Sequence, residues 1–350
     1  MRESRTPAQV FRAFADGEAV GTMYSPVARA LSESDAALRA LQDVPVRRRH
    51  PRVVLAALHD LALAGRAPAL AAAYVDGDGA AAGPAAVGTV LTRTDELVRT
   101  ATRRRVPGEL TGHAEVLYPA IAEAGRRGGA TTVGLIDVGS PGFNLLVDRV
   151  GIAYSSGSRV GDPMSPVQLT AAVVGPQQRV PTRGLPEVVA RIVVDEDPVD
   201  VSDEADIRWL RACLRPDQTE QRAKLDAELA VAASDPPVRL AGAVEHTLPD
   251  ALARIPASAL PVVLTTWSLS RLSVARRLEF HRRLSAAGRP VAWVSVEGVG
   301  VAPGVPTLGD RPASGHSIVG LAFFAGGAVQ ADVLGRCWSR GGLLSWLAPE

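Results

Sequence analysis

The stretch TTVGLIDVGSPGFNLLVD, residues 131–148, decides the fold that we predict for this chain. It begins with a run of strand-forming residues that ends at Asp137. A loop with two glycines, Gly139 and Gly142, follows, and a short apolar helix begins near Asn144. A buried strand that feeds a helix through a glycine loop is how open α/β sheets build a ligand crevice, because glycine lets the backbone approach a ligand closely. The loop lacks the phosphate-binding patterns GxxxxGK(S/T) and GxGxxG.

Strands and helices alternate from residue 130 onward. Four further apolar runs read as buried strands, at 191–194, 238–241, 260–266 and 291–296. Two pairs of runs read as antiparallel hairpins, 151–154 with 167–174 and 317–324 with 328–334. The pattern predicts an α/β fold for residues 127–350, with a Rossmann-like, doubly wound and mainly parallel sheet.

Residues 1–126 carry helical patterns and predict an N-terminal helical lobe that covers the substrate side of the sheet. Apolar residues recur at helical spacing in this region, for example in 9–18 and 52–63. The segment 76–88, DGDGAAAGPAAVG, has low complexity, and we expect it to form a surface loop.

The composition excludes several classes of protein. Lys+Arg 38 against Asp+Glu 37 gives a formal net charge of +1, so no overall field attracts nucleic acid or an anionic membrane. The N-terminus has no apolar signal core, and no apolar run is long enough to span a bilayer. The two cysteines form no spaced pair, as is usual for reduced thiols in the cytoplasm. We therefore predict a cytoplasmic protein without a membrane or nucleic-acid partner.

Metal and hydrolase patterns are missing from the sequence. It contains no HxxxH, no CxxC and no GxSxG, so we predict no metal site and no serine hydrolase elbow. Two arginine clusters, 47–49 and 103–105, are the only local feature typical of polyanion binding. Solvated helix ends explain them more simply, because no aromatic residues alternate with the arginines.

The order of several short boxes resembles a large bacterial family known only as domain of unknown function 2332. The boxes are FRAFADGEA (11–19), HPRVVLAALHDLALAG (50–65), LIDVGSPGFNLLVDR (135–149), VVDEDPVDV (193–201), DIRWLRACLRPDQ (206–218), PVVLTTWSLSRL (261–272) and VAWVSVEG (291–298). The resemblance runs from about Phe11 to Leu347. The family has no established activity, so this resemblance implies no particular reaction.

The acid at the strand end and the glycine turn also resemble the first motif of S-adenosylmethionine (SAM)-dependent methyltransferases. That resemblance implies that the loop passes under the methionine part of SAM. Asp137, Gly139, Gly142 and Asn144 are therefore candidate cofactor contacts. Asp195 ends the second strand, where the methyltransferase pattern places a carboxylate that accepts both ribose hydroxyls.

The ends of the fourth and fifth strands supply the candidate substrate and catalytic residues. Thr265, Thr266 and Trp267 follow the fourth strand at the edge where open α/β sheets bind ligands, and we assign them to substrate binding. Glu297 ends the fifth strand and is our candidate for the general base. The alternative for Glu297 is a helix cap or a surface salt bridge.

Two further candidates stand at positions where the family usually has a different residue. His113 replaces an arginine of the helical-lobe motif, and we expect the lobe to offer it as a second catalytic group, since histidine suits proton transfer near neutral pH. Arg340 replaces a histidine near the C-terminus and is assigned to substrate binding. Ala243 replaces an aspartate after the third strand, which removes a possible acceptor for adenine.

Two functions follow, and both stay open. The first is a SAM-dependent methyltransferase that acts on a small molecule. The second is a non-methylating enzyme or ligand-binding protein on the same fold, which Ala243 and the changed histidine positions favour. Neither the substrate nor the oligomeric state can be predicted from the sequence.

Overall fold

The computed structural model describes residues 5–175 and 179–349. The chain divides into two compact units, a helical unit of Met1–Leu110 with Ser202–Leu225 and a sheet unit of Thr111–Val201 with Asp226–Glu350. This division differs from the boundary that we predicted at residue 126. Helix α8 (Ala114–Gly128), which we assigned to the lobe, belongs to the sheet unit because it packs on strands of the sheet. Helix α9 (Glu204–Cys213) belongs to the helical unit.

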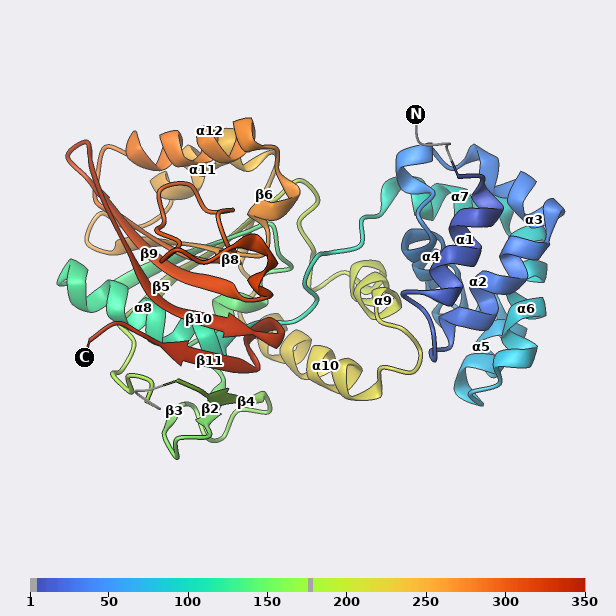
Figure 1. Cartoon of the computed structure of the whole chain (residues 1–350), viewed down its shortest axis with the longest axis horizontal. Coiled ribbons are helices and arrows are strands. Elements are labelled where there is room, and N and C mark those ends of the chain that lie inside the picture. The colour runs from blue at the N-terminus through green and yellow to red at the C-terminus, as the bar shows by residue number, and fades with distance from the viewer. Residues whose placement is uncertain (1–4, 176–178, 350) are drawn as a thin grey trace. The chain divides into compact units, whose positions relative to one another are not determined.

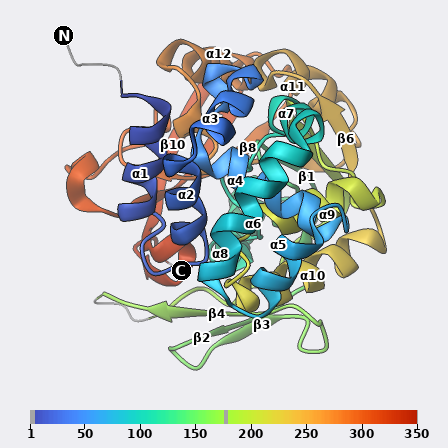
Figure 2. The same ribbon diagram turned by 90° about the vertical axis from the view of Figure 1, so that its right-hand side faces the viewer.

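The helices of the helical unit form a bundle, seen in Figure 2. Their buried side chains make one apolar core. Its other helices are α1 (Pro7–Asp16), α2 (Tyr24–Glu33), α3 (Asp35–Ala40), α4 (Pro51–Leu63), α5 (Pro68–Val75), α6 (Gly79–Thr92) and α7 (Thr94–Arg103). Trp209 of α9 is buried in this core, and its indole N–H donates to the carbonyl of Arg105 at 2.8 Å. His59 Nδ1 of α4 lies 3.0 Å from the carbonyl oxygen of Leu214. These bonds join the late segment 202–225 to the first 110 residues.

The prediction of a surface loop at 76–88 is wrong, because most of this segment lies in α6. Asp78 caps the helix by accepting from the backbone N–H of Ala81 at 3.0 Å. Gly83 lies against α2, where a Cβ would stand 3.0 Å from the Cβ of Ala30. The alanines favour a helix, and the glycine permits close packing, so the low complexity reflects a helix with small side chains.

The sheet unit contains an 11-stranded sheet with the order β3-β2-β4-β11-β10-β9-β8-β7-β1-β5-β6. Most of these strands are labelled in Figure 1. The strands are β1 (Thr132–Val138), β2 (Gly151–Tyr154), β3 (Arg159–Gly161), β4 (Gln168–Val173), β5 (Glu187–Asp195), β6 (Val238–Ala241), β7 (Leu260–Thr266), β8 (Val291–Gly298), β9 (Ser317–Ala325), β10 (Ala328–Trp338) and β11 (Leu343–Trp346). Strands β6, β5, β1, β7 and β8 are parallel to their neighbours in this series. The predicted α/β class with a mostly parallel sheet is confirmed.

The chain reverses its direction of travel across the sheet at β1. After β1 the chain first forms β2, β3 and β4 at the far edge of the sheet. It then adds β5 and β6 on one side of β1, and returns to β7 and β8 on the other side. The carboxyl ends of β1 and β7 therefore form a topological switch point, where open α/β sheets have their ligand crevice.

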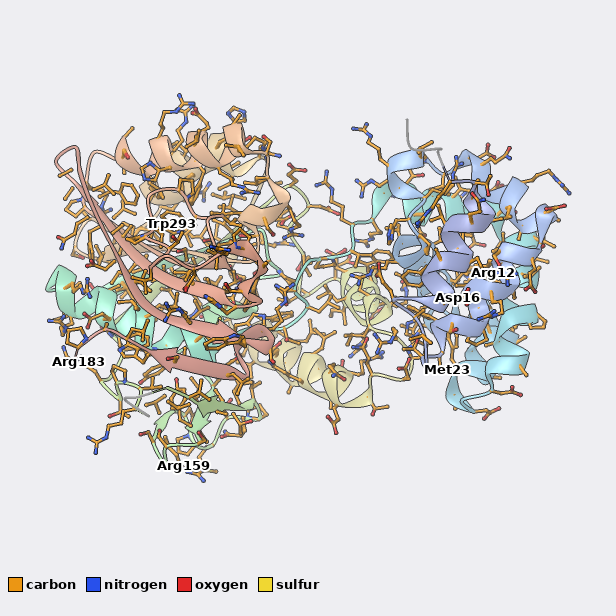
Figure 3. The ribbon with its side chains drawn as sticks, in the orientation of Figure 1. Arg12, Asp16, Met23, Arg159, Arg183 and Trp293 are labelled. Atoms are coloured by element: carbon orange, nitrogen blue, oxygen red, sulfur yellow. The ribbon has the colours of Figure 1, made fainter. Side chains whose placement is uncertain are left out.

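Helices cover both faces of the parallel strands. Helix α8 packs on β7, β8 and β9, whereas α11 (Val244–Ala253) and α12 (Val274–Ser285) cover the other face (Figure 1). Trp293 of β8, labelled in Figure 3, is fully buried under α12, with its ring 5.4 Å from that of Phe280. Strand β1 packs its Ile136 and Val138 into the same cluster.

The strands around the insertion after β1 pair differently from our prediction. Residues 151–154 and 167–174 do not form an antiparallel hairpin, because β2 and β4 pair in parallel. The turn after Tyr154 instead sends β3 back along β2 in an antiparallel pair. The hairpin of β9 and β10 is antiparallel as predicted, and β11, which we did not predict, pairs with β10.

In the residues that the structure describes, no single helix has the length and apolar character needed to cross a membrane. Together, α4 and α5 meet that test of length and composition, with a bend of 98° between them.

Candidate functional site

Asn144 joins three elements at the carboxyl ends of β1 and β7. It lies in the short 3-10 helix η3 (Phe143–Leu146) and is 2% exposed. Its amide nitrogen donates to Asp137 Oδ1 at 3.2 Å and to Thr266 Oγ1 at 2.9 Å. Its amide oxygen accepts from the backbone N–H of His113 at 3.1 Å. The predicted residues Asp137, Asn144, Thr266 and His113 thus meet at the switch point.

Asp137 is fully buried and is bonded within its own loop. Oδ1 accepts from Asn144, and Oδ2 accepts from the hydroxyl of Ser140, which also accepts the backbone N–H of Gly142 at 3.0 Å. Burial raises the pKa of Asp137 to about 6, although these donors and His113 oppose the shift. The pKa of this carboxyl group therefore lies well above the ordinary value for aspartate and closer to neutral pH.

His113 belongs to the sheet unit, not to the lobe that we expected to supply it. The backbone turns tightly before α8, where a Cβ on Gly112 would stand 2.7 Å from the carbonyl oxygen of Phe143. His113 is 4% exposed, and its ring meets the ring of Trp267 edge to face, with centroids 4.7 Å apart. Its Nδ1 lies 3.7 Å from Oε1 of Glu115.

Trp267 has a backbone conformation that few side chains adopt. Its φ is 49°, and Ser339 and Arg340 have φ of 49° and 52°. The guanidinium carbon of Arg340 stands 4.7 Å from the centroid of the Trp267 ring, and the indole N–H donates to Ser317 Oγ at 2.7 Å. Strained backbone that persists in this way is typical of functional sites. The two predicted substrate residues Trp267 and Arg340 are therefore in direct contact.

Glu297 lies on the opposite face of the sheet from Asp137 and Thr266. Thr266 is paired in register with Val296, so the next residue on β8 points to the other side. Glu297 is 1% exposed, and its Oε1 accepts the backbone N–H groups of Ser268 and Leu269 at 3.1 and 2.9 Å. These bonds cap the 3-10 turn η4 (Leu269–Arg271). Burial raises the pKa of Glu297 to about 7.

Thr265 faces the same side as Glu297. Its hydroxyl accepts from the indole N–H of Trp293 at 3.0 Å, deep in the core. The predicted substrate and catalytic residues therefore fall into two sets. Thr266, Trp267 and Arg340 lie with His113 or contact its neighbours. Thr265 and Glu297 lie on the α12 side of the sheet. The roles assigned to all five stay predictions.

The candidate cofactor residues lie at one edge of the sheet. Strands β1 and β5 pair in parallel with Val138 opposite Val194, so Asp137 and Asp195 end adjacent strands. Asp195 Oδ1 accepts the backbone N–H of Asp197 at 2.8 Å. Gly139 has a φ of 72°, and a Cβ there would stand 2.9 Å from Ser268 Cβ. Gly142 has a φ of 97°, and a Cβ there would stand 2.6 Å from Val193 Cγ2. The glycines are required by the turn and by its packing.

Three residues of this cluster were not predicted: Ser140, Glu115 and Ser317. Ser140 and Ser317 had no signal, because serine is common in loops. Glu115 stands in the first turn of α8, where an acid is expected for the helix dipole alone. Asn144, by contrast, is the only asparagine in the sequence, which is a signal in a chain that otherwise lacks this residue.

Among the side chains of residues 5–175 and 179–349, no group of three or more His, Cys, Asp and Glu is placed to hold a metal ion. The cluster has instead the chemistry of proton transfer and hydrogen bonding: two carboxyl groups, an imidazole, an amide, hydroxyls and an indole under a guanidinium.

Together, fold and cluster define a class of protein: a doubly wound α/β protein with a buried polar site at the switch point of its sheet. Residues 8–346 match the family described as "Uncharacterized protein conserved in bacteria (DUF2332)", and the chain belongs to that family. The family resemblance predicted from the sequence boxes is thereby confirmed. No curated protein and no solved structure gives a significant match.

Proposed function

We propose that this protein is a SAM-dependent methyltransferase that acts on a small molecule. The observation that carries the proposal is the pairing of β1 with β5 beside the switch point, which puts Asp137 and Asp195 at the carboxyl ends of adjacent strands. In an open α/β sheet this edge is where a nucleoside-containing cofactor binds.

The end of β5 fits the ribose part of SAM. Asp195 accepts the backbone N–H of Asp197 through Oδ1 and is only partly buried. The oxygens of an ionised carboxylate are hydrogen-bond acceptors, which is the chemistry that ribose hydroxyl donors need. SAM, when bound, supplies an electrophilic methyl group. Asp195 and the residues at the end of β1 would hold SAM in place, and correct alignment of the methyl group with its acceptor is the main source of rate acceleration in such a displacement.

The acceptor side of the proposed site consists of Trp267, Arg340, Thr266 and His113. Trp267 offers an indole edge and Arg340 a positive charge at 4.7 Å from the ring centroid. His113 takes the proton of an amine or alcohol acceptor. Glu297, on the other face of the sheet, is the competing candidate for this base.

A non-methylating enzyme or ligand-binding protein is the second candidate. It is favoured by the glycine loop, in which the Cβ position of Gly139 is filled by Ser268 and both Asp137 oxygens are bonded to Ser140 and Asn144. Ala243, at the start of α11, also lacks the acceptor that an aspartate would offer to adenine.

Ligand-dependent stability tests between the two candidates. SAM or S-adenosylhomocysteine at about 100 times its Kd is expected to stabilise the protein by about 2.7 kcal/mol, measured as a rise in Tm. Asp195→Ala should abolish the rise. Asp197→Ala removes the same charge from the same acidic run, keeps the N–H that binds Asp195, and should retain the rise. If neither ligand shifts Tm at millimolar concentration, the non-methylating alternative holds.

A further inference from the structure

A second carboxylate, Glu115, is buried beside His113. It is 5% exposed, and its Oε1 lies 3.7 Å from His113 Nδ1. Its Oε2 has no hydrogen-bond partner among the described residues. Buried glutamates are rare unless they are paired, so this position requires a reason beyond packing.

The protein holds Glu115 in place from three sides. It stands in the first turn of α8, where the helix dipole favours a negative charge. Its backbone carbonyl accepts the Tyr154 hydroxyl at 2.8 Å. Gly341 approaches so closely that a Cβ there would stand 2.4 Å from Glu115 Oε1, and its φ is 98°.

His113 is held equally firmly. Its backbone N–H donates to Asn144 Oδ1, and Trp267 packs edge to face with its ring. Trp267 thus contacts the ring, and the Asn144 bond holds the backbone. The 3.7 Å between Nδ1 and Glu115 Oε1 is longer than a hydrogen bond, so Glu115 acts on the ring through its charge. A carboxylate beside Nδ1 favours the tautomer with Nδ1–H and leaves the lone pair on Nε2.

We propose that Glu115 is the positioning residue for His113, and that the pair forms a proton-accepting dyad. This inference rests on the proposed function only for the identity of the acceptor molecule. In the step, the X–H bond of an amine or alcohol breaks, its proton passes to Nε2, and the electron pair stays on X. Glu115 stabilises the imidazolium that results.

Asp137 and Arg340 also lie near this histidine. Asp137 of β1 is close enough for the positive form of His113 to lower its pKa. Arg340, of the 3-10 turn η6 (Ser339–Gly341), lies over the Trp267 ring that His113 touches. The arginine opposes the charge of a protonated His113 and Asp137 favours it, so the effect of Glu115 must be measured by changing Glu115 alone.

The experiment is a pH titration by NMR of protein labelled with ¹⁵N-histidine. The sequence contains six histidines, and the His113 signals are assigned by their loss in His113→Gln. In the native protein we expect the Nδ1–H tautomer. Glu115→Gln should lower the midpoint of the His113 titration by on the order of one pH unit, because an opposite charge at this distance is lost. Glu115→Asp keeps the charge and should restore most of the shift.

Glu123→Gln is the matched control. Glu123 lies on the same helix and is bound by Arg126 and Arg127, so its loss should leave the midpoint of His113 unchanged. An unchanged midpoint in Glu115→Gln, or an Nε2–H tautomer in the native protein, overturns the proposal. If Glu115→Gln fails to fold, the test uses Glu115→Asp. The proposal is then overturned if the titration midpoint of His113 in Glu115→Asp equals its midpoint in the unfolded protein. No cofactor is present, so the result is independent of SAM binding.

Discussion

Substitution of Asn144 by alanine is expected to lower the free energy of unfolding of the sheet unit by about 3–5 kcal/mol. The amide of Asn144 bonds with Asp137, Thr266 and the backbone of His113, and all of these groups are buried. Alanine leaves two acceptors and one donor without this partner. Each such buried group costs about 1–3 kcal/mol, and the lost side-chain volume adds a small cavity.

Urea unfolding, followed by tryptophan fluorescence and by hydrogen exchange of β1 and β7 amides, measures this effect. Thr266→Val is the matched control, because it removes only one of the three bonds and should cost about 1 kcal/mol. A loss below 1 kcal/mol in Asn144→Ala would show that water or a rearranged loop replaces the amide, and that Asn144 does not organise the site.

Substitution of Glu297 by glutamine is expected to raise the free energy of unfolding above neutral pH, whereas Asn144→Ala lowers it. Burial raises the pKa of Glu297 to about 7 from the ordinary value of 4.5, so the folded protein keeps a proton that the unfolded chain releases. The stability that this proton gives is complete below pH 4.5 and is lost as the pH rises through 7. Glutamine stays neutral and can still accept the N–H groups of Ser268 and Leu269.

The variant should therefore match the native protein at pH 4 and exceed it by on the order of 3 kcal/mol at pH 8.5. Unfolding curves at both pH values measure the difference. The titration of Asp137 is the same in both proteins and cancels. Glu187→Gln changes an exposed glutamate and should show no such dependence. Equal stability of native protein and Glu297→Gln at both pH values would contradict the shifted pKa.

The same variant tests the predicted base. If Glu297 takes a proton from substrate, its loss should lower turnover by about 10²–10⁴. If His113 does so, Glu297→Gln should gain stability above pH 7 and keep its turnover. The position of Glu297 on the α12 face and its two backbone bonds favour the second outcome.

The positions of the central strands along the chain were predicted well from the sequence. Strands β6 and β7 have the predicted bounds, because a short apolar run between turn residues has few other interpretations. The face of each side chain was beyond prediction. Central parallel strands are buried on both sides, so LPVVLTT and VAWVSVEG show no alternation that would separate Thr266 from Glu297.

Two other errors have physical causes. In α6, small residues that look like a flexible loop form a helix because α2 packs against them. His113, which precedes α8, and Glu115 in its first turn look like the start of an amphipathic lobe helix, since only the fold shows that this helix packs on the sheet. The prediction of a helix there was correct, but the prediction that it belongs to the helical lobe was wrong.

The helical unit is built from two stretches of chain, and this has a consequence for its synthesis. The first 110 residues leave the ribosome without α9, whose Trp209 and Ala212 complete their apolar core. About 100 further residues must be translated before that helix appears, which takes roughly 5–20 s at usual rates of synthesis. During this interval the nascent bundle lacks two buried residues of its apolar core. Apolar surface that is exposed in this way promotes aggregation, so we expect the nascent bundle to be most prone to aggregate before residue 213 has been made.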